Sequence, residues 1–155
     1  MKKIQLNQEK FALVDDEDFE YLNRFKWRLH WQGYAIRTTL ASETKRNERR
    51  DIRMHREIMN CPPGLEIDHI DHDKLNNMRS NMRICTHQQN MCNQKKFGEY
   101  KGVSWHKGNK MWQANITMNG KQKNLGYSHD PVILARKYDA AAKGYFGEFA
   151  ALNFP

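Results

Sequence analysis

The 155-residue sequence predicts an α+β protein built of two modules. Short apolar runs that are typical of strands alternate with capped amphipathic segments that are typical of helices. The formal net charge of +8 is uneven: residues 94–155 hold ten Lys/Arg against four Asp/Glu, whereas residues 1–93 are nearly balanced. Residues 94–99 are expected to form a linker, because the residue pattern changes there. The basic second module indicates a polyanion-binding function, with a merely solvated basic surface as the alternative.

Strand-like runs surround one short helix in the first forty residues. The acidic segment 15–25 is expected to form that helix, with Asp15 or Asp16 as its N-cap. Gln32-Gly33 is a plausible hairpin turn, and the polar stretch 41–50 is expected to be an exposed loop. The strand candidates are residues 3–6, 11–14, 26–31 and 34–39. The aromatic side chains of this region are expected in the core rather than at a binding surface: Trp27, Trp31 and Tyr34.

Residues 66–77, EIDHIDHDKLNN, crowd acids and histidines together in a way that neither a solvated loop nor a buried strand needs. Histidine suits the role of a general base because its unperturbed pKa lies near neutrality. A divalent cation held by carboxylate or amide oxygens offsets the charge of a phosphate. Asp68 beside His69 offers both parts, so hydrolysis of a phosphodiester is the expected chemistry.

A strand, a loop, a second strand and a helix are expected around this cluster. The strands are residues 65–70 and 82–86, and Thr86 with Gln89 forms a capping box that opens the helix. This order would bring Asn90, on the second turn of the helix, against the first strand.

The ordered set LEIDHID, LNN, SNMR and QQN resembles the HNH, or ββα-metal, endonucleases, above all the branch found in phage and intron-encoded homing enzymes. The resemblance covers residues 52–93 and implies that His69 is the general base and Asp68 the first metal ligand. It also implies that Asn81 braces the loop and orients the histidine, and that Asn90 is the second metal ligand. Many members have histidine at this last position, and asparagine there favours Mg²⁺ or Mn²⁺ over zinc.

Several roles near the motif stay open. Adjacent side chains of a regular strand point to opposite faces, so His69 could share a site with Asp71 but not with Asp68. The family resolves this with a distorted strand end, which favours Asp68 and leaves Asp71 in reserve. The other histidines have two interpretations each: a surface position or a phosphate contact for His72 and His87, and packing or a phosphate contact for His55.

Residues 100–155 predict three antiparallel strands and one helix. Asn119-Gly120 is a strong hairpin signal, and Asp130 followed by Pro131 predicts the start of a helix. The segments YKGVSWH, KMWQANI, LGY and ARKYDAAAKGYFGEFAALNFP resemble the plant ethylene-response-factor, or APETALA-type, DNA-binding domain. The resemblance implies a sheet that lies in the major groove of double-stranded DNA, with the helix packed behind it.

Strand alternation, with the parity that this second family implies, assigns the residues that face DNA. The candidates for base contacts are Lys101, Ser104, His106, Lys110 or Met111, Asn115, Thr117, Gln122 and Asn124. The candidates for phosphate contacts are Lys107, Lys121 and Lys123. Trp105 and Trp112 are expected to pack against the helix rather than stack on bases. The target sequence of the plant proteins does not transfer, because they carry arginines and tryptophans at many of these positions.

We therefore expect an HNH nuclease domain at residues 1–93, with its motif core at 52–93, and a DNA-binding domain at 100–155. The expected function is homing-type, site-directed cleavage of double-stranded DNA. Two other functions are compatible with the sequence: a non-catalytic DNA-binding regulator on a decayed nuclease fold, and a broad-specificity phage nuclease. One set of catalytic groups means that a monomer would nick and a homodimer would cut both strands, and the sequence leaves these two undetermined.

Neither a membrane nor a secreted location is expected. No apolar run approaches the roughly 18 residues that span a bilayer, and the N-terminus lacks the apolar segment of a signal peptide. The three cysteines are odd in number and lack a CxxC pair, so we expect reduced thiols and no structural zinc site. A phage-encoded protein of this kind would act in the host bacterial cytoplasm.

Overall fold

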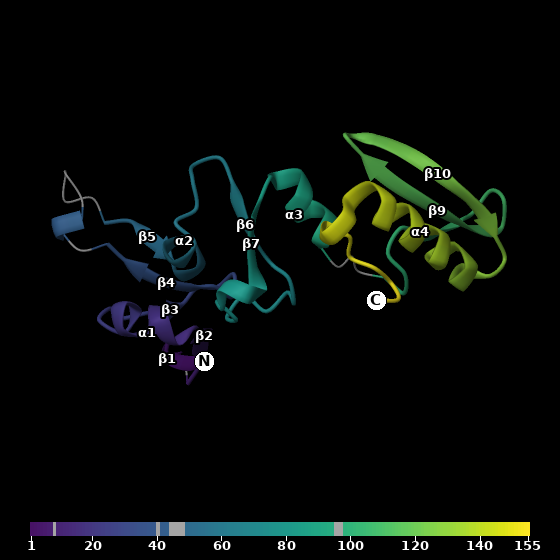
Figure 1. The fold of residues 1–155 in the computed structure, drawn as a ribbon. Helices are drawn as coiled ribbons and strands as arrows, with labels where there is room; N and C mark the ends of the chain where they lie inside the picture. Colours follow the sequence, from purple (N-terminus) through teal and green to yellow (C-terminus); the bar gives the residue numbers. More distant parts are fainter. Residues whose placement is uncertain (8, 40, 44–48, 95–97) are drawn as a thin grey trace. The chain divides into compact units, whose positions relative to one another are not determined.

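The computed structural model describes residues 1–7, 9–39, 41–43, 49–94 and 98–155. These residues form two compact units, Met1–Thr86 and His87–Pro155, which Figure 1 colours from purple to teal and from teal to yellow. The helix predicted to be the last element of the first module, residues 87–93, belongs to the second unit in the structure. The module boundaries therefore stay a prediction. Half of the expected linker, and part of the expected loop at 41–50, lie outside the described residues.

The first unit begins with a hairpin and a short helix, as predicted. Strands β1 (Lys2–Gln5) and β2 (Phe11–Val14) pair antiparallel, and α1 (Asp16–Leu22) follows them. Asp15 occupies the N-cap position, and three acids fill the first turn, where negative charge is favourable. The Asp15 carboxylate does not bond to its own helix, but accepts a hydrogen bond of 2.7 Å from the backbone N–H of Arg79.

A three-stranded sheet and a second short helix follow. Strands β3 (Arg28–Leu29), β4 (Ala35–Thr38) and β5 (Asp51–Arg53) pair antiparallel in that order, with the 3₁₀ turn η1 (Ala41–Glu43) between the last two. Helix α2 (Met54–Ile58) starts directly after β5. The first of these strands is shorter than predicted, because the chain turns from His30 to Gly33, where Gly33 has a φ of 89°.

The core of the first unit collects apolar side chains from all these elements. Its buried members are Ile4, Leu6, Ala12, Val14, Leu22, Trp27, Ala35, Met54, Ile58, Ile67 and Met82. Trp27 is buried as expected, and its indole N–H donates to the Leu22 carbonyl at 2.8 Å. The same expectation is wrong for Trp31, whose side chain is 85% exposed.

The hairpin that carries the acid–histidine cluster closes the first unit. Strands β6 (Glu66–His69) and β7 (Met82–Cys85) pair antiparallel, with the 3₁₀ turn η2 (Arg79–Asn81) just before the second strand. The loop between them is tied to the N-terminal hairpin by a parallel bridge between Leu13 and Asn76. Ile67 and Met82 anchor the two strands in the core.

The second unit contains helix α3, a three-stranded sheet and a long helix. Helix α3 (His87–Asn93) begins directly after Thr86, and the sheet has the order β10-β9-β8. Its strands are β8 (Val103–His106), β9 (Met111–Met118) and β10 (Lys121–Ser128), with the predicted Asn119-Gly120 turn at positive φ in both residues. Helix α4 (Pro131–Phe146) starts as predicted, because the Asp130 carboxylate accepts from the backbone N–H of Val132 at 2.8 Å. The 3₁₀ turn η3 (Gly147–Phe149) follows.

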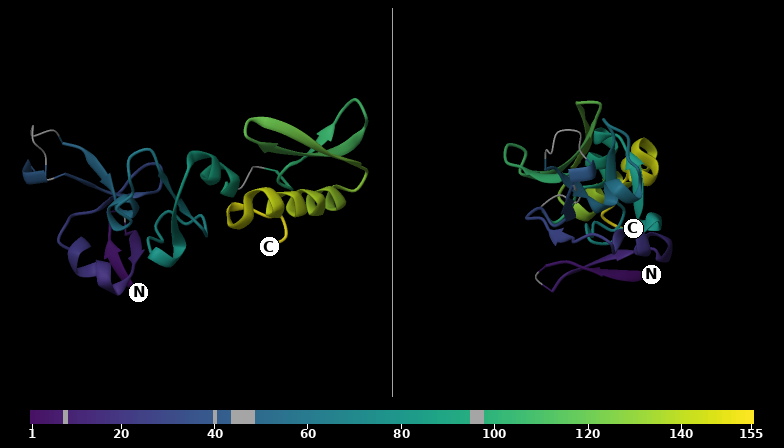
Figure 2. Two further views of the ribbon diagram at one scale, coloured as in Figure 1. Left: turned by 45° about the horizontal axis from the view of Figure 1, so that its top comes forward. Right: turned by 90° about the vertical axis from the view of Figure 1, so that its left-hand side faces the viewer.

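Helix α4 packs along one face of this sheet, as the left view of Figure 2 shows. Ile116, Tyr138 and Ala142 form the buried cluster between them. The C-terminal segment folds back onto the helix, where the Asp139 carboxylate accepts hydrogen bonds from the backbone N–H groups of Asn153 and Phe154 at 2.8 and 2.9 Å. These contacts fix the helix to the sheet and to the end of the chain.

All three cysteines are free thiols. Within the described ranges, no helix has both the length and the apolar character needed to cross a bilayer.

Candidate nuclease site and nucleic-acid interface

The centre of the candidate site is the end of strand β6. Asp68 pairs with Arg83 of β7 and His69 with Met82, in a ladder that stays regular to the last residue. Adjacent side chains of a regular strand point to opposite faces, and both of these side chains are buried, with 5% and 6% of their surface exposed. The distorted strand end that would bring Asp68 and His69 to one side is not present in this ladder.

The Asp68 carboxylate is bound by the residue opposite it. The Nε and Nη2 groups of Arg83 donate to Asp68 Oδ2 at 2.8 and 2.7 Å. A buried carboxylate is stable only when it is paired and hydrogen-bonded. The cross-strand register supplies that partner, and Arg83 is therefore part of the site although the sequence reasoning did not assign it a role.

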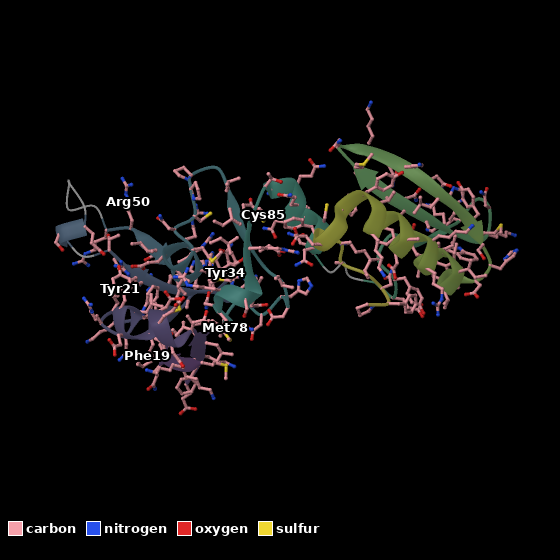
Figure 3. The ribbon with its side chains drawn as sticks, in the orientation of Figure 1. Phe19, Tyr21, Tyr34, Arg50, Met78 and Cys85 are labelled. Atoms are coloured by element: carbon pink, nitrogen blue, oxygen red, sulfur yellow. The ribbon has the colours of Figure 1, made fainter. Side chains whose placement is uncertain are left out.

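His69 lies on the opposite face, in a small cluster of rings. Its ring centre is 5.2 Å from that of His55 and 6.2 Å from that of Tyr34. Figure 3 shows Tyr34 among the side chains at the centre of the first unit. Burial lowers the pKa of His69, although Asn77 and nearby acids act in the other direction. The imidazole is therefore neutral at neutral pH and able to accept a proton.

One side chain hydrogen-bonded to the imidazole is that of Asn77, which is fully buried. Its Nδ2 group donates to the Leu75 carbonyl at 3.1 Å, so the amide oxygen is the atom that faces His69 Nε2, at 3.4 Å. An amide oxygen only accepts hydrogen bonds. The contact therefore favours the tautomer with its proton on Nε2, which leaves the lone pair on Nδ1.

Asn81 connects the two ends of the loop, and its predicted role in orienting the imidazole stays a prediction. Its Oδ1 atom accepts from the backbone N–H of Asp71 at 3.1 Å, and its Nδ2 group donates to Asp71 Oδ1 and to the Asn76 carbonyl, both at 2.9 Å. Burial would raise the pKa of Asp71, but hydrogen bonds from Asn76, Asp73 and Asn81 hold the pKa below its ordinary value. Asp71 is thus an ionised member of the loop.

The N-terminal hairpin holds this loop in place. The Leu13 N–H donates to the Leu75 carbonyl, and the Asn77 N–H donates to the Leu13 carbonyl, both at 2.8 Å. Arg79 adds a charged contact, because its guanidinium donates to both oxygens of Asp18 at 2.9 and 2.7 Å. Residues far upstream of the motif therefore fix the backbone that carries Asn77.

Two of these residues were accessible to sequence reasoning. Asn77 belongs to the LNN segment that carries the family resemblance, although the sequence assigned it no role of its own. Arg83 follows from the hairpin register, because a residue directly opposite a buried aspartate is the natural site for a cation. The contact with Leu13 has no sequence signal, since it uses backbone atoms alone.

The oxygen donors of the site fit a hard divalent cation, since carboxylate and amide oxygens are the ligands that Mg²⁺ and Mn²⁺ prefer. Asp68 is the buried carboxylate, and Asp71 is the ionised one on the loop. Among the described residues, no group of three or more His, Cys, Asp or Glu side chains has the arrangement of a metal site. Asn90 lies on α3 in the second unit, so its approach to Asp68 belongs to the proposal below.

The second unit presents a polar face on the side of its sheet that α4 does not cover. The registers of β8, β9 and β10 place several side chains on the side opposite the buried Ala114 and Ile116. Two contacts within this polar face are Gln113 to Ser104 at 3.3 Å and Asn124 to Asn115 at 3.1 Å. Seven predicted DNA contacts share this face: Ser104, His106, Met111, Asn115, Thr117, Gln122 and Asn124.

The predicted lysine contacts lie elsewhere. Lys101 is not on the polar face, because its ammonium donates to the carbonyls of Cys92 and Gln94. Lys121 and Lys123 pair with Met118 and Ile116, on the side of the sheet that α4 covers, and Lys123 donates to the Tyr145 hydroxyl at 2.9 Å. Lys107 and Lys110 lie in the exposed turn between β8 and β9.

The register places the two tryptophans of this sheet on the α4 side, although Trp105 is 48% exposed and the predicted packing of both on the helix stays a prediction. Trp105 pairs with Trp112, and their rings meet edge to face at 5.4 Å. Because their register places them on the same side as the buried Ala114, their faces do not lie on the polar face.

A β-hairpin that ends in a buried neutral histidine, with a carboxylate on the adjacent residue and a loop held by amides, carries groups that hydrolysis of a phosphodiester requires. The model of the HNH endonuclease family matches residues 60–92, which span this hairpin. An uncharacterized HNH endonuclease of Acanthamoeba polyphaga mimivirus is 32% identical over 149 residues, which cover 92% of this chain and 74% of that protein. The chain belongs to the HNH endonucleases and is a nuclease.

Two further relatives match parts of the chain. Protein 3.8 of Escherichia phage T7 is 39% identical over 68 residues, which are 41% of this chain and 56% of that protein. An AP2-like ethylene-responsive transcription factor of Arabidopsis thaliana is 40% identical over 58 residues, which are 37% of this chain and 13% of that protein. The last similarity is partial and covers a small share of the plant protein.

Replacement of Asn77 by alanine should change the tautomer of His69. The variant removes the oxygen that faces Nε2, so the preference for a proton on Nε2 should weaken, and the loss of a buried amide should lower the free energy of unfolding by about 1–3 kcal/mol. Imidazole ¹⁵N chemical shifts of the full chain measure the tautomer. The exposed His87 and His129 serve as internal controls. Identical His69 shifts in both proteins would show that Asn77 does not set the tautomer.

The buried His55 should make the first unit sensitive to acid. Burial, with the nearby His69, lowers the pKa of His55 to about 3, whereas an unfolded histidine titrates near 6.5. Between these values the unfolded chain binds a proton that the folded chain does not, so the free energy of unfolding should fall as pH falls, by at most about 1.4 kcal/mol per pH unit for this group.

Urea unfolding between pH 4.5 and 7.5 tests this, with His55→Phe as the variant that cannot titrate. His55→Phe should show a shallower dependence on pH than the native chain, and His129→Phe, at an exposed position, should not. An unchanged slope in His55→Phe would contradict the assignment.

Proposed function

We propose that this nuclease cleaves double-stranded DNA, with His69 as the general base that activates water. The observation that carries the proposal is the environment of His69, a buried and neutral imidazole that Asn77 contacts through Nε2. Nδ1 then holds the lone pair that accepts a proton from water. The hydroxide attacks phosphorus, the bond to the leaving oxygen breaks, and the proton of the water molecule stays on His69.

Asp68 and Asn90 are the residues that we propose to hold a divalent cation, Mg²⁺ or Mn²⁺, with Asp71 in reserve. When bound, such an ion neutralises charge on the phosphodiester and on the leaving oxygen. The pairing of Asp68 with Arg83, and the regular ladder at His69, support a larger role for Asp71 than the family resemblance alone implies. The guanidinium of Arg83 places a positive charge directly beside the Asp68 carboxylate.

We further propose that residues 100–155 form a DNA-reading module of the ethylene-response-factor type. The support is the partial similarity to the plant transcription factor and the polar face opposite α4. A sheet of this width fits the major groove, where every base pair presents a distinct pattern of donors and acceptors. The proposed base contacts are then the residues on that face, which excludes Lys101, and the register likewise removes Lys121 and Lys123 from the proposed phosphate contacts.

A homing role, in which the module directs cleavage to one site, is the form of this function that we propose. The viral origin of two relatives supports action inside an infected cell. The intact histidine and carboxylate argue against a regulator on a decayed nuclease fold. The polar face of the second unit argues against a broad-specificity nuclease, because such a nuclease needs no separate DNA-reading surface.

Replacement of His69 by alanine should lower the cleavage rate by about 10²–10⁴-fold, because the general base is lost. DNA binding should persist. Plasmid nicking and linearisation in Mg²⁺, with and without a chelator, measure the rate, and gel shift measures binding. His129→Ala is the matched control, as an exposed histidine of the second unit. Cleavage by His69→Ala at the native rate would refute the assignment.

The same plasmid cleavage assays on Asp68→Asn and Asp71→Asn show which carboxylate the metal-dependent cleavage requires. A greater loss in Asp71→Asn would show that the regular strand geometry decides the ligand set. Thermal unfolding of each variant separates this effect from the loss of the ion pair with Arg83.

Replacement of Gln122 by glutamate should weaken DNA binding by the full chain. The change adds one negative charge to the polar face, where it would lie against phosphates and base acceptors. Ala140→Glu is the matched control, because it adds the same charge at an exposed position of α4. The equilibrium affinity for a duplex that the native protein cleaves should fall several-fold more in Gln122→Glu than in the control. Equal losses would mean that the polar face is not the DNA-binding surface.

A further inference from the structure

The turn between β3 and β4 presents an aromatic side chain to solvent on a rigid backbone. Trp31, at its tip, is 85% exposed. The turn is closed by hydrogen bonds of 2.8 Å from the His30 N–H to the Tyr34 carbonyl and from the Gly33 N–H to the His30 carbonyl. The Gln32 N–H also donates to His30 Nδ1 at 3.3 Å. The turn therefore holds an indole in solvent, and an indole offers a partner a large apolar face with a polar N–H.

Two cations attach this turn to the nuclease site. Arg53 donates to Gln32 Oε1 at 3.2 Å, and Lys74 donates to the Gln32 carbonyl at 3.0 Å. Both cations also lie over the ring of Tyr34, at 5.1 and 4.7 Å from its centre. Tyr34 in turn lies against His55 and His69. The turn that carries Trp31 is therefore linked to the candidate general base through the two cations and Tyr34.

A hollow of about 380 Å³ lies beside the turn. Its lining includes His30, Arg53 and Arg56, and one acid, Asp51. Asp51 accepts two hydrogen bonds from Arg28, at 2.8 and 2.9 Å, so its charge is offset. The surroundings of the turn thus have a positive balance. A polyanion matches this balance, whereas a second copy of this chain, with its net charge of +8, does not.

We propose that the His30–Gly33 turn is a DNA contact of the nuclease site, in which Trp31 stacks on a base near the scissile phosphate and Lys74 and Arg53 meet the neighbouring phosphates. Indole faces stack on bases of any sequence, and exposed apolar side chains of DNA-bending proteins insert between base steps. The substrate class that this contact selects is a duplex with an unstacked or unpaired base at the cleavage position. The proposal rests on the nuclease function proposed for the same site.

The test compares Trp31→Ala, Trp31→Phe and Lys74→Gln in the full chain. The control is Phe11→Ala, which removes another exposed aromatic ring of the first unit. The probes are a 30-base-pair duplex, the same duplex with one unpaired thymine, and a single strand of thymidylates. Fluorescence anisotropy in chelator, at several salt concentrations, gives affinities without any cleavage.

Trp31→Ala should bind the two probes with unpaired bases about 5- to 100-fold more weakly, as expected for one lost stacking contact. Trp31→Phe should retain most of the affinity because it keeps a ring. The salt dependence should be unchanged in Trp31→Ala, since no charge is lost, and the slope of log affinity against log salt should flatten by about 0.7–0.9 in Lys74→Gln. All variants should melt near the native temperature.

Native affinity of Trp31→Ala for all three probes would overturn the proposal. So would a loss that depends on protein concentration, which would identify a second copy as the partner of Trp31. These binding results are independent of the chemistry. If His69→Ala still cleaves while Trp31→Ala loses affinity, the assigned general base is wrong and the proposed DNA contact of Trp31 stands. If His69→Ala is inactive while Trp31→Ala binds normally, the general base stands and the proposed DNA contact is wrong.

Discussion

The backbone contact between Leu13 and the loop after β6 is the constraint on which the nuclease site depends. That loop has no regular secondary structure before η2, so its polar groups need partners outside a helix or sheet. Leu13 satisfies the Leu75 carbonyl and the Asn77 N–H, and this places the Asn77 amide, fully buried, against His69. The residues that match the HNH family model begin at position 60. The N-terminal hairpin is therefore a structural part of the site although it lies outside the motif.

The regular pairing of β6 with β7 divides the polar chemistry between two faces of one strand. On one face Asp68 is held by Arg83, and on the other His69 lies among Asn77, His55 and Tyr34. Burial lowers the pKa of both histidines, and so keeps two adjacent imidazoles neutral where two charged ones would repel. The same burial makes His69 available as a proton acceptor at neutral pH.

The second unit uses the two faces of a sheet in a comparable way. Apolar side chains of β9 pack on α4, and the alternate residues form a polar face with β8 and β10. Trp105 and Trp112 therefore lie on the α4 side, whereas in the first unit Trp31 projects from a turn. The polar face of the second unit still holds an exposed aromatic ring, because Tyr127 pairs with Gln113 on that side.

The sequence by itself determined most of the strands and helices, the Asn119-Gly120 hairpin and the identity of the acid–histidine strand, because these follow from short-range signals; it did not predict β5 or α2. Asn119-Gly120, Asp130-Pro131 and the alternation of β9 are examples of such signals. The tertiary structure decided which side chains meet. Asn77 contacts His69, Arg83 binds Asp68, Lys123 donates to Tyr145, and Trp31 is exposed rather than buried. Each of these outcomes depends on the register between strands or on backbone contacts between distant segments, and residue type along the chain does not encode such distances.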